Sequence, residues 1–338
     1  MFRFFIVSGV CIAAVAGIWA GGETYASKRL AQLVQDNPAT QASSVEAMRQ
    51  PPNFGVELQD FTLTDPAATL AFPWARIVMS PTTPTTAQLQ LPDHGQLQIE
   101  GQDYDLGLSG DYSKIRLAPL KRLAPDHIDL MADAVTLDGQ AVIEGLDIDL
   151  QMGRLSATAP LAARSVYEAA VNLGALRTQM LAQLGVDLGP LPDPVTMNGK
   201  LRLWMDGTPS VTDEHAPDIV GWQTEGLTLG AGAMSLRLVG RVVRGADGLT
   251  EGQLAIYTTD AKAIIDQAAE LDLIPQQSRM LLTFGLGQLA RAEIDPDIDG
   301  PEFPEASDGQ MRLPVVLKEG QIFLGGIAIG AAPPFGSI

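Results

Sequence analysis

The stretch HIDLMADAVTLDGQAVIEGLDIDLQMG, from His127 to Gly153, alternates apolar and polar residues in two runs that an Asp-Gly pair separates. A period of two places successive side chains on opposite faces of a strand, and Asp-Gly is a favoured tight-turn sequence. The apolar set is Ile128, Leu130, Val135, Leu137, Leu146, Ile148 and Leu150. The stretch therefore predicts antiparallel strands with one apolar and one polar face.

Comparable runs lie on both sides of it. TAQLQLP, GQLQIEG and YDLGLSG precede it, and TMNGKLRLWMDG, TEGLTLG, AMSLRLVGRVV, EGQLAIYTT and MRLPVVLKEGQIFLGGIAIG follow it. The chain contains 34 glycines and 23 prolines, which indicates many turns between short elements. In FGVELQDFTLTDP the alternation slips by one residue, which predicts a bulge or a strand change around Gln59 and Asp60.

Three segments show helical spacing instead. Apolar residues recur every three or four positions from Leu161 to Leu184, and Asp260 can cap a helix from Ala261 to Leu273. A further helix is expected from Gln276 to Ala292. The predicted fold class is α+β and mainly antiparallel β, with one or more curved sheets and about three packing helices.

The N-terminus carries a long apolar segment. Phe4 to Ala20 has no charged residue, and Gly21 and Gly22 extend it, so its length approaches the roughly 20 residues that span a bilayer. Ala20 and Gly22 would allow cleavage as a signal peptide. An uncleaved anchor is favoured by the length and by the amphipathic stretch from Tyr25 to Val34 that follows directly. Arg3 places the body outside the cytoplasm, although Lys28 and Arg29 lie on the wrong side for that rule.

We therefore expect a transmembrane or signal helix before the fold, and a single pass of the inner membrane through residues 4–22 with the body in the periplasm. The expected organisation is a signal anchor at 1–22, a helical or linker spacer at 23–53 and a β-rich exported body at 54–338. Residues 153–174 and 252–273 align at an offset of 99 with five identities. This alignment suggests an internal repeat of 54–186 and 196–292.

Composition excludes several classes of function. The formal net charge of −18 repels phosphate backbones and anionic headgroups, so no nucleic-acid partner is expected. The one cysteine, Cys11, lies in the N-terminal apolar run, so the body has neither a disulfide nor a C-x-x-C metal or redox site.

No catalytic or cofactor-binding residue is predicted. His94, His127 and His215 are accompanied by no nucleophile elbow, zinc-protease motif or phosphate loop, and we interpret them as surface residues. Asp295, Asp297 and Asp299 match the start of a calcium loop, but Ala306 stands where that loop needs a glutamate. A solvated loop is the better interpretation. A hydrolase with an unrecognised acidic site stays an alternative, because forty acidic residues make carboxylate pairs unavoidable.

The apolar sheet faces need a cover. A sheet that curls on itself, or a second sheet, would close them. Otherwise part of a face stays open as a groove that suits an acyl chain. The residues expected to line such a groove, or to form the core instead, are Leu97, Ile99, Leu146, Ile148, Leu201 and Leu203. The leading hypothesis is a membrane-anchored, non-catalytic binding or structural protein that contacts lipid, and the alternative is an envelope scaffold that binds proteins through strand edges.

The closing segment MRLPVVLKEGQIFLGGIAIGAAPPF, from Met311 to Phe335, resembles that of the DUF2125 family of alphaproteobacterial proteins. LQDFTLTDPAATLAFPWARI and GQAVIEGLDIDL agree with the family in order. The resemblance implies no established activity. It implies a fold similar to AsmA-like envelope proteins, which are anchored in the inner membrane and present β-sheet grooves in the periplasm, an analogy at the level of the fold.

Overall fold

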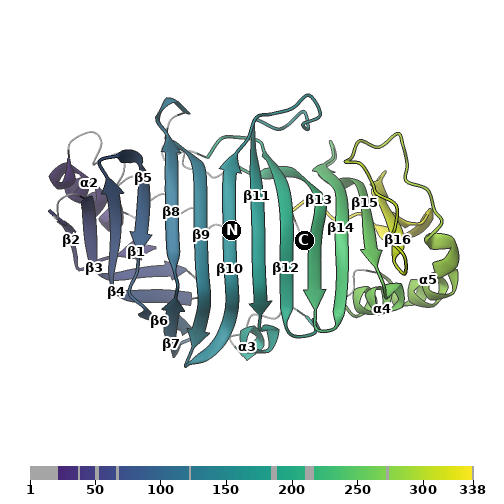
Figure 1. Cartoon of the computed structure of the whole chain (residues 1–338), viewed down its shortest axis with the longest axis horizontal. Helices are drawn as coiled ribbons and strands as arrows, with labels where there is room; N and C mark the ends of the chain where they lie inside the picture. Colours follow the sequence, from purple (N-terminus) through teal and green to yellow (C-terminus); the bar gives the residue numbers. More distant parts are fainter. Residues whose placement is uncertain are drawn as a thin grey trace. The chain divides into compact units, whose positions relative to one another are not determined.

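The computed structural model describes residues 22–36, 39–49, 53–65, 68–121, 123–183, 189–209, 217–271 and 274–336. The chain forms two units. Unit 1 comprises Met1–Met152 with Thr208–Pro217, and unit 2 comprises Gly153–Gly207 with Asp218–Ile338. Each unit is an antiparallel sheet with its own helices (Figure 1).

Unit 1 carries one long helix and ten strands in its described part (Figure 1). They are α2 (Glu23–Asp36), β1 (Thr40–Gln41), β2 (Ser44–Ala47), β3 (Phe54–Asp65), β4 (Ala68–Ser80), β5 (Thr83–Gln90), β6 (His94–Ile99), β7 (Gln102–Ser109), β8 (Tyr112–Ala118), the 3-10 turn η1 (Pro119–Lys121), β9 (Ala124–Leu137) and β10 (Gln140–Met152).

Two long strands, β4 and β9, organise this sheet. The start of β4 pairs with β6 and its end pairs with β5. β9 pairs with β8 through its first half and with β7 through its last residues. Because β5 pairs with β8 and β6 pairs with β7, two short strand pairs connect the same two long strands. β3 and β10 pair with the other edges of β4 and β9.

Helix α2 and strands β3 and β4 supply buried apolar side chains to the core of unit 1. Helix α2 contacts β1, β2 and β3. Its residues Ala26, Leu30 and Val34, spaced four apart, are at most 5% exposed. The apolar side chains Val56, Leu58 and Ile77 of β3 and β4 are buried as well.

The segment 23–53, expected to be a helical or linker spacer, contains helix α2 and two short strands, β1 and β2. Thr40 of β1 lies opposite Leu63, and Val45 of β2 lies opposite Leu58. Ser, Gln and Ala have weak strand preference, but contact with α2 and β3 overrides it, because strand propensity depends strongly on context.

The slip in alternation at Asp60 is present without a bulge or a strand change. β3 runs through this point in unbroken register with β4, with Gln59 opposite Trp74 and Phe61 opposite Phe72. Asp60 has a φ of 48°, in the left-handed region that Asp tolerates better than most residues. The Ser43 hydroxyl donates a 2.7 Å hydrogen bond to the Asp60 carboxylate. The left-handed conformation of Asp60 shifts the buried positions of β3 from even-numbered residues, Val56 and Leu58, to odd-numbered residues, Phe61 and Leu63.

Unit 2 is a meander in which each strand pairs with the next along the chain. Its elements are β11 (Ser165–Leu176), α3 (Thr178–Gln183), β12 (Val195–Met205), β13 (Ile219–Ala231), β14 (Met234–Arg244), β15 (Thr250–Thr258), α4 (Ala261–Glu270), α5 (Gln276–Leu289), β16 (Met311–Lys318), β17 (Gln321–Leu324) and β18 (Ile327–Ala331).

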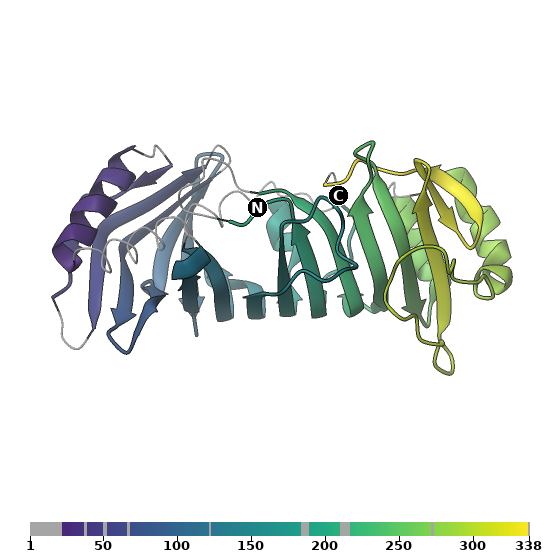
Figure 2. The same cartoon turned by 90° about the horizontal axis from the view of Figure 1, so that it is seen from above.

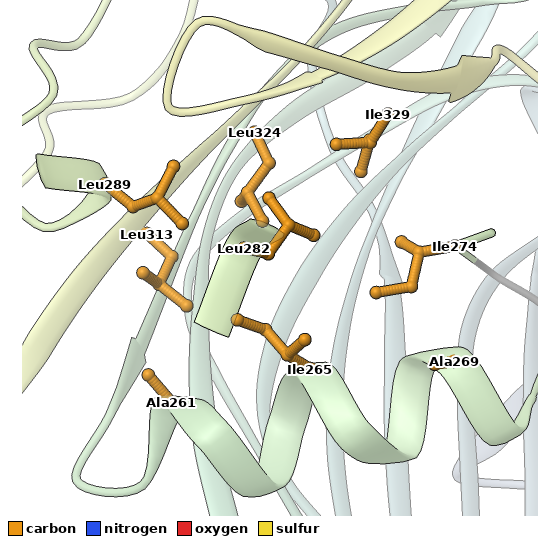
Figure 3. Close-up of a cluster of buried hydrophobic side chains, with 9 residues drawn as sticks. All are labelled: Ala261, Ile265, Ala269, Ile274, Leu282, Leu289, Leu313, Leu324 and Ile329. Carbon is orange, nitrogen blue, oxygen red and sulfur yellow. The ribbon is translucent and has the colours of Figure 1, made fainter. Parts of the chain in front are cut away.

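Helices α4 and α5 pack at the β15–β18 end of this sheet, away from β11 and β12 (Figures 1 and 2). The predicted cap is confirmed, since the Asp260 carboxylate accepts a 3.0 Å hydrogen bond from the backbone N–H of Ala263. The shared core of helices and strands (Figure 3) consists of Ala261, Ile265, Ala269, Ile274, Leu282, Leu289, Leu313, Leu324 and Ile329.

Two segments without regular structure, one that contains Thr158 and one that contains Pro304, contact the face of unit 2 opposite α4 and α5. The guanidinium of Arg241 donates a 3.0 Å hydrogen bond to the carbonyl of Thr158. The Tyr257 hydroxyl donates to the carbonyl of Pro304 at 2.7 Å. Burial raises the pKa of Tyr257 above its ordinary value.

The helix predicted from Leu161 to Leu184 is wrong. The structure forms strand β11 there, followed by the short helix α3. Ser165, Val166, Tyr167 and Ala169 are all buried, so both faces of the first half of the strand are covered and period-two alternation is lost there. A strand of this kind cannot be distinguished from a buried helix by periodicity. The offset of 99 also aligns β11 with residues that form α4, so the aligned stretches differ in secondary structure.

The mainly antiparallel β fold with three longer helices, α2, α4 and α5, confirms the predicted fold class. The predicted N-terminal apolar segment falls almost wholly on residues 1–21, outside the described residues. Among the helices that are described, none combines the length and the apolar character that crossing a membrane requires.

Candidate functional site

The apolar face of unit 2 is only partly covered. Register places eight half-buried side chains of β11–β14 on the face that carries α4 and α5. We call this set the open apolar face. It consists of Leu173, Met197, Leu201, Leu203, Trp222, Leu229, Leu236 and Leu238.

The boundary of the helical cover lies at β15. Leu238 of β14 is opposite Ile256 of β15, and Ile256 packs against the core formed by α4 and α5. The eight residues of the open apolar face do not belong to that core. The sheet face therefore continues beyond the α4–α5 core as an uncharged apolar face, on which the eight half-buried residues lie beside buried neighbours such as Tyr167 and Leu227.

The opposite face of β11 and β12 carries charged and polar side chains. Glu168 of β11 and Arg202 of β12 form a 2.9 Å ion pair, and the Asn198 amide donates to Asn172 at 3.1 Å. These strands thus separate charged and apolar side chains onto different faces.

The six residues predicted to line a groove fall into three places. Leu201 and Leu203 belong to the open apolar face of unit 2. Leu146 and Ile148 lie on β10 of unit 1, half-buried and opposite Ala132 and Leu130 of β9. The remaining two, Leu97 and Ile99, are half-buried on β6, where Leu97 is opposite Leu70. The four residues of unit 1 thus lie on two separate strands, β6 and β10.

A second feature lies on the polar face of unit 1, where His127 and Asp129 of β9 meet Asp149 of β10. The Nε2 atom of His127 is 2.7 Å from Oδ1 of Asp129 and 2.9 Å from Oδ2 of Asp149. The three side chains are 20%, 23% and 38% exposed, in that order. Asp129 and Asp149 are register partners, and Gln151 is the partner of His127.

The electrostatics of this cluster favour an ionised Asp149. Partial burial acts to raise its pKa, but hydrogen bonds from His127 and Gln151 outweigh that effect and leave the pKa below its ordinary value. The amide of Gln151 donates to Oδ1 of Asp149 at 2.9 Å. A negatively charged Asp149 therefore stays beside Asp129 and the imidazole.

His94 lines a different feature of unit 1. An open depression of about 450 Å³ is lined by Asp60, His94 and Asp105 together with Phe72 and Pro73. His215 lies outside the described residues, and the structure therefore says nothing about its predicted surface position.

The acidic loop considered for calcium directs its carboxylates toward basic partners. One carboxylate oxygen of Asp295 lies 3.5 Å from Nζ of Lys318, and Asp299 lies 3.3 Å from Arg241. The other Asp295 oxygen accepts the backbone N–H of Asp297 at 3.1 Å. Asp295 and Asp299 thus contact cationic side chains of β16 and β14.

Sequence reasoning missed the cluster around His127. Its signal is present, because His127 and Asp129 are two apart on one predicted strand and so share a face. Asp149 falls on the next predicted strand, across the Asp138-Gly139 turn. The irregularity between Ala141 and Ile143 shifts the register, so the pairing of Asp129 with Asp149 could not be counted from the turn.

The fold is that of a two-unit antiparallel β protein whose sheets are each partly covered by helices. The chain belongs to the DUF2125 family, described as "Uncharacterized protein conserved in bacteria", which matches residues 50–333 from before β3 to beyond β18. No match was found among curated proteins or among solved structures. The family description names no activity.

Proposed function

We propose that the chain is a membrane-anchored periplasmic protein that holds the acyl chain of a lipid on the open apolar face of unit 2. One observation carries the proposal, namely eight half-buried apolar side chains on four adjacent strands beyond the reach of the α4 and α5 core. Apolar side chains that are gathered on one sheet face and left only half-buried are a candidate interaction site.

The chemistry of the surface favours an acyl chain. None of its eight side chains is charged, and Trp222 and Met197 add polarisable groups to six leucines. The strands that carry it are 11 to 13 residues long, or about 35 to 45 Å at roughly 3.3 Å per residue. That length accommodates an extended acyl chain.

The N-terminal segment supports the same assignment. The apolar run from Phe4 to Ala20 approaches the length that spans a bilayer. An anchored body would meet lipids at high local concentration. Its net charge of −18 disfavours adsorption to an anionic surface, so a lipid would have to be taken up as a single molecule through apolar contact.

Native mass spectrometry of the full chain, gently extracted from membranes, tests the proposal, with lipid extraction of the same sample. We expect phospholipid in a fixed stoichiometry. A ligand-free chain would overturn the proposal. A co-purified protein without lipid would favour the envelope scaffold instead.

Tryptophan quenching locates the lipid on the chain. Lipids brominated in the acyl chain should quench Trp222, which is half-buried opposite Leu203. Trp204 is 1% exposed and packs with Val166 and Val220 on the other face, so it should not be quenched. Trp222→Phe should therefore remove most of the body's fluorescence that brominated lipid quenches. Trp204→Phe should leave that quenched fluorescence unchanged. Equal quenching in the wild type and Trp222→Phe would contradict the assignment to this face.

A further inference from the structure

Three potential metal ligands converge on the polar face of unit 1. They are the imidazole of His127 and the carboxylates of Asp129 and Asp149, whose ligand atoms all lie within 4.8 Å of one another. Among the described residues this is the one group of three or more such side chains. Two adjacent β-strands hold it, so its backbone positions are well defined.

The hydrogen bonding of the cluster is incomplete by itself. Oxygens of Asp129 and Asp149 both approach the same atom, Nε2 of His127, at 2.7 and 2.9 Å. That nitrogen can carry only one hydrogen. A single N–H cannot point along both directions, so one of the two oxygens that face Nε2 receives no hydrogen from the imidazole. That oxygen is free to accept a hydrogen bond from water or to bind a cation.

We infer that His127, Asp129 and Asp149 bind a divalent transition-metal ion such as Zn²⁺ or Mn²⁺. On bonds of about 2.1 Å, ligand atoms lie about 3.0 Å apart at the right angles of an octahedral ion and about 3.4 Å apart around tetrahedral Zn²⁺. The observed separations of 2.7 and 2.9 Å would have to widen by only a few tenths of an ångström to admit an ion. One imidazole and two carboxylates are ligands that these ions accept. Three protein ligands leave further coordination positions open for water or for an anionic ligand.

The surrounding side chains orient these ligands. Gln151 donates to the outer oxygen of Asp149 at 2.9 Å, while Nζ of Lys114 lies 3.9 Å from the outer oxygen of Asp129. Such outer contacts fix metal-binding carboxylates and commonly affect affinity. Arg116, the β8 neighbour of His127, is engaged by Asp126 at 2.9 Å, which reduces its repulsion of a cation.

The test uses the full chain in detergent, stripped with a chelator, dialysed and titrated with Zn²⁺ by calorimetry, and with Mn²⁺ by electron paramagnetic resonance. We expect one ion per chain. Affinity should fall as the pH is lowered, because protons compete for His127 and for the carboxylates. Absence of Zn²⁺ and Mn²⁺ binding at neutral pH would overturn the inference.

Variants separate this site from adventitious binding. Asp149→Asn keeps the shape of the side chain and should weaken Zn²⁺ binding by more than about 100-fold, whereas Gln151→Ala should weaken it by about 10-fold. His94→Ala removes another histidine of unit 1 and should leave the affinity unchanged. Circular dichroism confirms that each variant folds. Unaltered binding by Asp149→Asn, or loss of binding in His94→Ala alone, would overturn the assignment.

Discussion

At the scale of single residues, Asp266 connects α4 and α5. One of its oxygens lies 2.6 Å from Lys262 on the same helix, and the other lies 2.7 Å from Arg279 on α5. Hydrogen bonds from these two cations lower the pKa of Asp266 below its ordinary value. The ionised form is thus favoured in the folded state.

We therefore expect Asp266→Asn to destabilise the chain at neutral pH. Because the folded pKa is depressed, the contribution of Asp266 is complete above its unfolded pKa of about 3.9 and disappears as the pH falls through the folded pKa. The difference in unfolding free energy between the wild type and Asp266→Asn should be constant from about pH 5 to pH 7 and should shrink below about pH 4. Urea denaturation across this range measures it. A difference that grows toward low pH would contradict the assignment.

Gly252 on β15 is a position where backbone geometry requires glycine. Its φ is 137°, and a Cβ atom would overlap the carbonyl oxygen of Arg241 on β14. Gly252→Ala should cost several kcal/mol, because strained backbone and overpacking each cost about 1–3 kcal/mol.

Gly287 provides the matched control for Gly252. It lies in α5, exposed, with nothing within 4 Å of an added Cβ. Gly287→Ala should stabilise the chain by about 0.5–1 kcal/mol through helix propensity. Thermal and urea unfolding of both variants test this pair, and equal effects would show that backbone geometry does not distinguish the two sites.

At the scale of elements, α5 depends on its buried side. Leu282 is fully buried in the core of Figure 3, whereas Met280 is 69% exposed on the same helix. Leu282→Ala should destabilise the chain by about 2–5 kcal/mol, since it removes packed methyl groups and leaves a cavity. Met280→Ala should change stability by less than about 0.5 kcal/mol. Chemical denaturation compares them, and similar losses would contradict the observed orientation of α5.

The elements also divide into those the sequence predicts and those it does not. β9 and β10 were predictable because one face is apolar and the other polar. α4 was predictable because Asp260 precedes a regular apolar stripe. β11 was not, since both faces of its first half are buried and Ala-rich sequence suits a helix equally well. β1 and β2 could not be predicted from the sequence, because they form strands only through their contacts with α2 and β3.

At the scale of the whole molecule, charge dominates the expected interaction with surfaces. Residues 1–22 contain one charged side chain, Arg3, so the chain that lacks them has a formal net charge of −19 instead of −18. It should stay in the supernatant when anionic vesicles are sedimented at low salt, because like charges repel. The full chain should sediment with vesicles through its N-terminal apolar segment. Sedimentation of the truncated chain with anionic vesicles would show that another surface binds the bilayer.

The sequence by itself determined the antiparallel β class, the membership of the family and the polarity of the strand faces, and it contains no recognised catalytic motif. The β class and the polarity of the strand faces follow from local periodicity, whereas membership of the family follows from the match over residues 50–333. Only the tertiary structure decided which apolar residues remain half-buried, and that His127 and Asp129 meet Asp149. Both outcomes depend on strand register and on where α4 and α5 end, and contacts between distant segments set these. A one-residue slip in register would move every side chain of a strand to the other face.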